Sequence, residues 1–122
     1  MKTMTQEWAD DFARDWIEAW NAHDLERVLS HYTLDFEMSS PFITNYTQEP
    51  SGTLRGRDQI ETYWRTALER LPHLHFELLG VLVGVGSVCL FYKTSFDKLA
   101  AEVLFVNESG KVYQGAAHYG QP

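Results

Sequence analysis

The chain has 122 residues, 44% of them hydrophobic and 22% charged, and a net charge of −7. This length suits a single domain over residues 1–122 with one hydrophobic core. The acidic excess argues against binding to nucleic acid, whose phosphates require clustered Lys and Arg, and against an anionic membrane surface. No apolar stretch reaches the about 20 residues of a membrane-spanning helix, and the polar first residues are unlike a signal peptide. We therefore expect a cytoplasmic protein.

The single cysteine, Cys89, excludes a disulfide within the chain. Its apolar neighbours Val88 and Leu90 indicate a packing role rather than a nucleophile. Aromatic residues are frequent, with four Trp, six Tyr and seven Phe. Such rings fill cores and also line ligand pockets.

The first part of the chain has the apolar spacing of three helices. Residues 8–20 carry apolar side chains every three or four positions, which predicts an amphipathic helix. Asp24 is placed to cap a short second helix over residues 25–32. A third helix is expected to begin near residues 56–58 and to end at Pro72, because proline cannot continue a helix.

A strand is predicted between the second and third helices. Alternate residues share one face of it: Leu34, Phe36, Met38, Ser40 and Phe42. This period of two is typical of a strand with one buried face. Pro41 suggests a sheet edge or the end of the strand. Residues 44–56 are rich in turn formers and are predicted to be a loop.

The remainder of the chain has the pattern of strands joined by short turns. The expected strands are residues 73–83, 87–96, 99–106 and 112–119. Helices followed by antiparallel strands predict an α+β fold, in which the three helices of the first half cover one face of a curved sheet.

Several short segments accompany this element order. They are Trp20-Asn21-Ala22-His23-Asp24-Leu25, Leu29-Ser30-His31-Tyr32, Ser40-Pro41-Phe42, Gly56-Arg57-Asp58-Gln59-Ile60 with Tyr63-Trp64, and Asn107-Glu108-Ser109-Gly110-Lys111-Val112. Together they resemble the nuclear transport factor 2-like superfamily, which includes ketosteroid isomerases and SnoaL-like proteins. The resemblance implies a cone-shaped, barrel-like, cystatin-like fold with an antiparallel sheet, helices on its concave face and a pocket inside. Because this superfamily hosts many functions, the site needs its own argument.

The resemblance to ketosteroid isomerases places their three catalytic groups on this chain. The carboxylate base falls on Ser40, the tyrosine donor on Trp16 and the carboxylic acid donor on Glu102. Serine alone is no general base, and an indole is not a phenol. Only the acid position is kept, with one more methylene than aspartate, which argues against steroid isomerisation.

Glu102 is the candidate catalytic residue. It alternates with Leu104 and Val106, so the strand pattern places it on the apolar inner face. Burial there would raise its pKa and suit it to acid or base chemistry near neutral pH. Two other interpretations stay open: a shift of register that points Glu102 to solvent, and an ion pair with Arg or His.

The same alternation predicts the pocket wall. The candidate ligand-binding residues are Trp16, Trp20, Tyr32, Ser40, Phe42, Trp64, Tyr92, Thr94 and Tyr119. Aromatic walls with few polar groups favour a small apolar ligand with one or two polar handles. Gly115 and Ala117 are small and would leave room. No cofactor motif is recognised.

Two features belong to the outside of the predicted cone. His73, His75 and Glu77 alternate on one strand face with ligand-like spacing, but they lack a clear fourth ligand, so no metal site is predicted. The outer sheet face also carries Phe91 and Phe105. Since a sheet that is apolar on both faces must be covered on both, we expect a homodimer through this face.

Two functions remain open. The first is a SnoaL-like pocket protein, and within it an acid–base enzyme of isomerase, cyclase or hydratase type that uses Glu102. The second is a non-catalytic dimeric accessory or protein-interaction domain. A pocket-facing Glu102 with a raised pKa favours catalysis, whereas a filled core with Glu102 in a salt bridge favours the accessory role.

Overall fold

The computed structural model describes residues 3–120, which form four helices and one six-stranded sheet. The first half contains α1 (Gln6–Asn21), α2 (Leu25–Leu29), β1 (Tyr32–Ser39), α3 (Pro41–Thr47), β2 (Thr53–Arg55) and α4 (Arg57–Arg70). The second half contains β3 (Glu77–Gly84), β4 (Ser87–Lys93), β5 (Leu99–Val106) and β6 (Val112–Tyr119).

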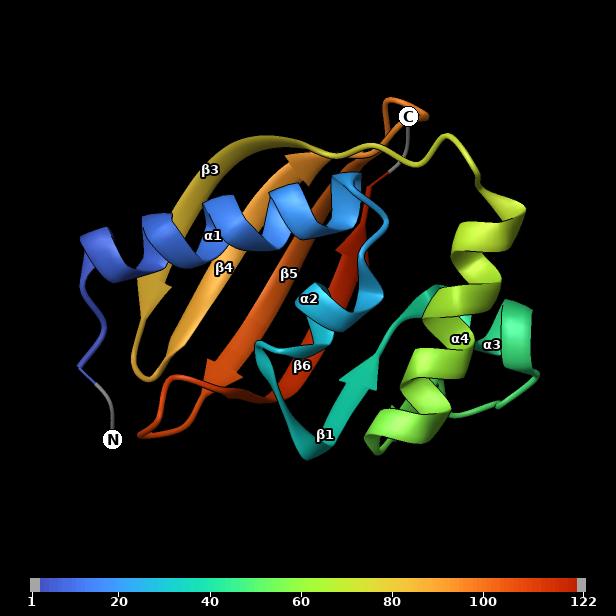
Figure 1. The fold of residues 1–122 in the computed structure, drawn as a ribbon, viewed down its shortest axis with the longest axis horizontal. Helices are drawn as coiled ribbons and strands as arrows, with labels where there is room; N and C mark the ends of the chain where they lie inside the picture. The colour runs from blue at the N-terminus through green and yellow to red at the C-terminus, as the bar shows by residue number, and fades with distance from the viewer. Residues whose placement is uncertain (1–2, 121–122) are drawn as a thin grey trace.

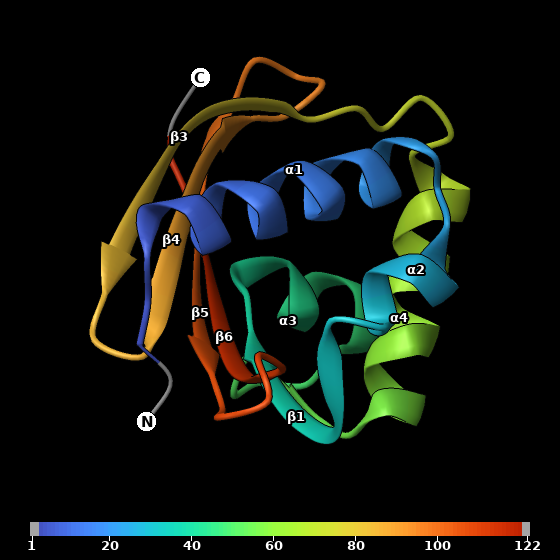
Figure 2. The same ribbon diagram turned by 60° about the vertical axis from the view of Figure 1, so that its left-hand side comes forward.

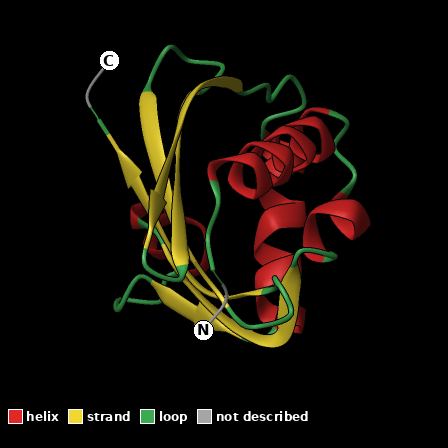
Figure 3. Ribbon diagram, turned by 90° about the vertical axis from the view of Figure 1, so that its left-hand side faces the viewer, coloured by secondary structure: helices red, strands yellow, loops and turns green. Residues whose placement is uncertain are grey.

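The sheet is curled but not closed, with strand order β2-β1-β6-β5-β4-β3 (Figure 1). All neighbouring pairs are antiparallel except β1 and β6, which run parallel. Helix α1 crosses the concave face, and Figure 3 shows most of the helical ribbon on one side of the strands. Helices α3 and α4 lie side by side, and α4 also contacts β1 and β2 (Figure 2). The α+β fold with helices on the concave face of a curved sheet is confirmed.

Side-chain capping residues mark the start of each of the first two helices. The hydroxyl of Thr5 accepts a hydrogen bond from the backbone N–H of Trp8 at 3.1 Å, and Asp24 accepts one from that of Arg27 at 3.1 Å. The prediction that Asp24 caps the second helix is therefore confirmed. The second helix is shorter than expected, because Tyr32 already pairs with Val112 of β6 as the first residue of β1.

Strand β1 breaks its own alternation. The register against β6 shifts between Tyr32 and Glu37, so the pairing is irregular in the first half of the strand. Phe36 and Met38 are buried as predicted, but Leu34 is 76% exposed. The prediction that Leu34 shares their buried face is wrong for this reason.

The predicted loop at residues 44–56 contains structure. Ser40 is the N-cap of α3, with its hydroxyl accepting from the N–H of Phe42 at 3.2 Å, and Pro41 is the first helical residue. Serine followed by proline favours a helix start. Because β1 ends at Ser39 and is not an edge strand, the prediction that Pro41 marks the end of the strand is confirmed and the alternative of a sheet edge is wrong. Phe42 consequently projects from a helix. Strand β2 follows and pairs with β1 through Glu37 and Arg55.

Strand β3 begins later than residue 73. The side-chain amide of Asn21 makes two hydrogen bonds with the backbone of Phe76. It donates to the C=O at 3.0 Å and accepts from the N–H at 2.7 Å. The ring nitrogen Nε2 of His23 lies 2.9 Å from the C=O of Leu74. These contacts take the place of a strand ladder, and they fix Phe76 against the core at the end of α1.

The outer face of the sheet is apolar and partly exposed. Phe91 is 38% exposed, Tyr113 44% and Leu82 63%. Cys89 pairs with Val103 on this face and is half-buried, so it is less enclosed than its apolar neighbours suggested.

Candidate functional site

A cavity of about 450 Å³ lies between the helices and the concave face of the sheet. Its size is within the range of about 300 to 1,000 Å³ that ligand pockets occupy. The lining includes the predicted residues Trp16, Trp20, Ser40, Phe42, Trp64, Tyr92, Thr94, Glu102 and Tyr119. Of the predicted set, only Tyr32 does not line the cavity. The elements that supply the wall are α1, α3, α4, β1 and β4–β6, with the segments that precede β3 and β5.

Glu102 is the one buried carboxylate of the described chain, with 6% exposure. It lies on β5 between Leu90 of β4 and Ala117 of β6, on the inner face. Its Oε1 accepts a hydrogen bond from the hydroxyl of Tyr92 at 3.0 Å, whereas its buried Oε2 has no partner within residues 3–120. Burial raises the pKa of this carboxyl to about 7 against the opposing effect of the Tyr92 hydrogen bond.

Hydroxyl groups continue from Glu102 along the cavity wall. Tyr92, Tyr119, Ser40 and Tyr63 all line this cavity. Burial raises the pKa of all three tyrosines, that of Tyr63 to about 12, so that they stay protonated donors at neutral pH. The carboxyl thus lies on a cavity wall that also carries several neutral hydroxyls.

Trp16 does not offer the donor that its position suggested. Its indole N–H donates to the hydroxyl of Tyr32 at 3.0 Å, and both side chains are buried. The Trp16 ring lines the cavity, but its N–H is already used, and Tyr32 orients the indole from outside the lining.

Trp20 offers a donor instead. Its indole Nε1 is buried without a hydrogen-bond partner among the described residues, and its ring lines the cavity. Neighbouring rings hold it in place, with that of Trp64 at 5.1 Å and that of Phe76 at 5.9 Å between centroids. A buried, unpaired polar atom costs about 1 to 3 kcal/mol, and Trp20 Nε1 and Glu102 Oε2 are the two such side-chain atoms among the described residues.

Sequence reasoning missed several wall residues. Tyr46 lines the cavity from α3, Phe76 from the segment held by Asn21, and Phe96 and Lys98 from the turn before β5. The Ser40-Pro41 pair was the available signal for α3. Alternation with His75 and Glu77 indicated the inward side of Phe76, and a hydrogen bond to Asn21, 55 positions away, holds its backbone there.

Small residues contribute less space than expected. Ala117 lines the cavity, but Gly115 does not. A Cβ atom at Gly115 would come within 2.5 Å of Sδ of Met38 and 2.8 Å of Cδ2 of Leu104. The absence of a side chain at Gly115 therefore lets Met38 and Leu104 pack against β6 and does not leave room for a ligand.

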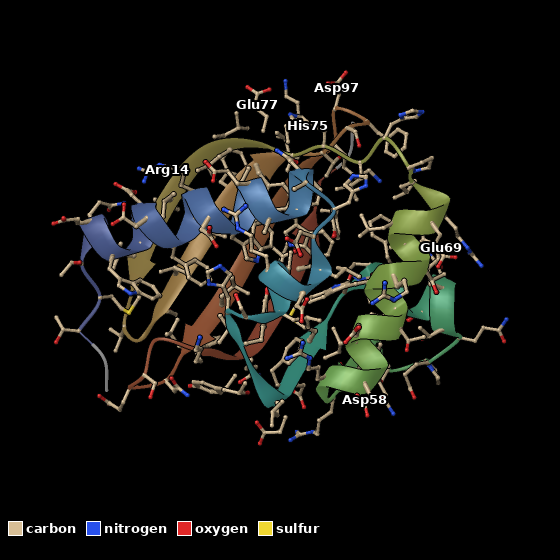
Figure 4. The ribbon with its side chains drawn as sticks, in the orientation of Figure 1. Arg14, Asp58, Glu69, His75, Glu77 and Asp97 are labelled. Carbon is tan, nitrogen blue, oxygen red and sulfur yellow. The ribbon has the colours of Figure 1, made fainter. Side chains whose placement is uncertain are left out.

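The predicted outer histidine cluster lies away from the cavity. His73, His75 and Glu77 are exposed, and Figure 4 shows the labelled His75 and Glu77 at the outer edge of the molecule. Within residues 3–120, no group of three or more His, Cys, Asp or Glu side chains gathers closely enough to hold a metal ion. Nor does any helix in that range have the length and apolar character needed to cross a membrane.

Comparison with known proteins agrees with this architecture. Residues 13–119 match the profile of the SnoaL-like domain. A SnoaL-like protein of unknown function from Burkholderia thailandensis is 48% identical, with a TM-score of 0.94 over 98% of this chain and 100% of that one.

More distant structures show the same fold. A protein with a cystatin-like fold from Methylobium petroleophilum is 18% identical, with a TM-score of 0.75 over 98% of this chain and 80% of that one. An NTF2-like protein from Cytophaga hutchinsonii is 16% identical, with a TM-score of 0.67 over 98% and 95%. None of the curated proteins matches the chain. The profile match and the 48% identity over nearly the whole chain show that this protein belongs to the SnoaL-like family.

Proposed function

We propose that the protein binds a small, largely apolar molecule in its cavity and that Glu102 acts on that molecule as a general acid or base. The observation that carries the proposal is the state of Glu102. One oxygen is held by Tyr92, and the other is buried at the wall of a hollow cavity without a partner.

The geometry suits transfer of a proton to or from a carbon or oxygen atom of the ligand. With a pKa of about 7, the carboxyl is present in both protonation states near neutral pH, which is the condition for efficient acid–base catalysis. The Tyr92 hydrogen bond fixes the carboxyl plane and leaves Oε2 to react. The N–H of Trp20 provides a donor for a ligand oxygen. This constellation favours an isomerase, cyclase or hydratase type of reaction.

The accessory interpretation required a filled core and an ion-paired Glu102. In the described chain, the cavity persists between Trp16, Trp64 and Tyr119, and no Lys, Arg or His forms a salt bridge with Glu102. Both features support the pocket and the acid–base role. Steroid isomerisation stays disfavoured, because Ser40 occupies the base position and serves as the cap of α3.

Exchange of carbon-bound hydrogen tests the proposal without knowledge of the natural ligand. 2-Tetralone is an apolar ketone with acidic α-hydrogens, and its incorporation of deuterium from D₂O is followed by NMR. We expect the protein to accelerate exchange above the buffer rate, more strongly as pH rises through about 7, since the base form of Glu102 then accumulates.

Two variants decide the origin of that exchange. Glu102→Gln keeps the shape but removes the base, and should return the rate to that of buffer. Glu77→Gln makes the same chemical change at an exposed carboxylate and should leave the exchange rate at the wild-type value. Wild-type exchange at the buffer rate, or equal rates for wild type and Glu102→Gln, would refute the catalytic role.

A further inference from the structure

We propose that the mouth of the cavity carries an anion-binding subsite centred on Lys98, so that the ligand is an apolar molecule with one negatively charged group, such as a carboxylate. This inference rests on the proposed function and names the ligand class for the same cavity. It is carried by the distribution of charge along the wall and by the contacts of Lys98.

Lys98 lies in the turn before β5 and is half-buried at the cavity wall. Its Nζ lies 5.6 Å from the centroid of the Phe42 ring, and that ring packs 4.6 Å from the ring of Tyr119. Phe42 and Tyr119 are themselves wall residues. The ammonium group is thus held by a cation–π contact over the aromatic lining rather than extended into solvent.

The charge of Lys98 is not neutralised within the described chain. No carboxylate there forms a salt bridge with it. Among the lining residues, Lys98 is the one cation and Glu102 the one acid. An ammonium group that lies over an aromatic ring and has no counter-ion can form a charge-assisted hydrogen bond with an anionic group of a ligand.

The two charged residues of the wall are separated along β5. Lys98 directly precedes the strand and Glu102 lies four positions later, which corresponds to about 13 Å along an extended strand. An anionic group beside Glu102 would meet a second negative charge in a desolvated place. At the mouth, it would keep part of its hydration and pair with Lys98. The ligand therefore enters with its apolar body first.

A second cation strengthens this end of the molecule. The guanidinium carbon of Arg70, at the end of α4, lies 5.0 Å from the centroid of the Tyr46 ring, which also lines the cavity. No carboxylate of residues 3–120 forms a salt bridge with Arg70. Lys98 and Arg70 thus both lie over aromatic rings of the cavity wall, where either cation could pair with an anionic ligand group.

Two fluorescent probes that differ in one group test the subsite. 8-Anilinonaphthalene-1-sulfonate carries a sulfonate, and N-phenyl-1-naphthylamine is the same molecule without it. We expect the sulfonate probe to bind wild type more tightly, with an advantage that shrinks as salt rises because surface charges are screened. Lys98→Met should weaken its binding roughly five-fold while changing that of the neutral probe by less than about two-fold.

Matched variants locate the effect. Lys98→Arg should restore the preference for the sulfonate, and Lys93→Met, which removes a cation outside the cavity lining, should leave both affinities unchanged. Ala117→Leu narrows the cavity and should weaken both probes equally. Thermal unfolding confirms that each variant is folded.

The outcomes separate the two proposals. If the neutral probe binds but the sulfonate gives no advantage, or if Lys98→Met weakens both probes equally, the anion subsite is refuted while the pocket function stands. If neither probe binds wild type, the pocket function fails and the subsite with it.

Discussion

Tyr92 and Glu102 lie diagonally on neighbouring strands and share a hydrogen bond of 3.0 Å from the phenol to Oε1. Both are buried on the inner face of the sheet. The bond orients the carboxyl and satisfies one of its oxygens, so that only Oε2 is left to act on a ligand. The acid–base proposal depends on this division of roles between the two oxygens.

Tyr92→Phe tests that division. The hydrogen bond from Tyr92 lowers the pKa of Glu102, so its removal should move the titration midpoint of Glu102 above about 7. It should also cost about 1 to 3 kcal/mol of stability, since Oε1 is then buried without a donor. Carbon-13 NMR of labelled glutamate carboxyls follows the midpoint. Tyr113→Phe, on the partly exposed outer face, is the control. An unchanged midpoint in Tyr92→Phe would contradict the assigned contact.

The pH dependence of stability reports the same group. The folded protein holds the Glu102 proton more tightly than the unfolded chain, because burial raises the pKa from 4.5 to about 7. The resulting stabilisation is complete below pH 4.5 and is lost as pH rises through about 7. It amounts to about 3 kcal/mol.

Glu102→Gln provides the comparison for that loss. This variant keeps a polar, uncharged group and should be more stable than wild type at pH 8, by an amount that vanishes toward pH 4.5. Urea unfolding at several pH values measures the difference. A stability difference that does not change with pH would show that Glu102 titrates normally.

Much of the fold and most of the wall followed from local pattern. The period of two along residues 99–106 placed Glu102 inward, and the same period placed Tyr92 opposite to Phe91. These strands are regular in the structure, so alternation was sufficient to assign their faces. The cap at Asp24 and the end of the third helix before Pro72 also depend on near neighbours only.

The missed features depend on distant contacts or on competing local signals. Leu34 is exposed because pairing with β6 shifts within β1, and the parallel direction of that pair is set by the path of the chain. Phe76 reaches the wall because Asn21 binds its backbone. Ser40-Pro41 was a local signal for a helix start that the preceding strand pattern obscured.

Asn21→Ala should loosen the wall at Phe76. The variant removes both hydrogen bonds to the backbone of that residue and should destabilise the protein by about 2 kcal/mol. Hydrogen exchange at the Phe76 amide should increase more than at amides of β5. Asn45→Ala, at an exposed position of α3, is the control. Equal protection of the Phe76 amide in wild type and Asn21→Ala would argue against this anchoring role.

Gly115→Ala should disturb the core under β6. The new methyl group would meet Sδ of Met38 at 2.5 Å and Cδ2 of Leu104 at 2.8 Å, so the variant should lose about 1 to 3 kcal/mol. Gly80→Ala is a matched control, because a Cβ there meets nothing within 4 Å. Denaturant unfolding compares the two, and equal stabilities would contradict the tight packing.

The homodimer expected from the outer face remains to be measured. Phe91→Glu should place a charge in that interface, whereas Leu34→Glu alters a residue of β1 that is 76% exposed. Sedimentation equilibrium should give wild type and Leu34→Glu twice the 14.1 kDa chain mass, and Phe91→Glu the single mass. A monomeric wild type at micromolar concentration would rule out the dimer.

A crystal structure of the protein grown with 2-tetralone tests the central claim most directly. The account predicts the ketone inside the cavity between Trp16, Trp20 and Trp64, with its polar atom or α-carbon within reach of Oε2 of Glu102. A cavity closed by its own side chains, or the ketone bound only outside it at saturating concentration, would contradict the claim.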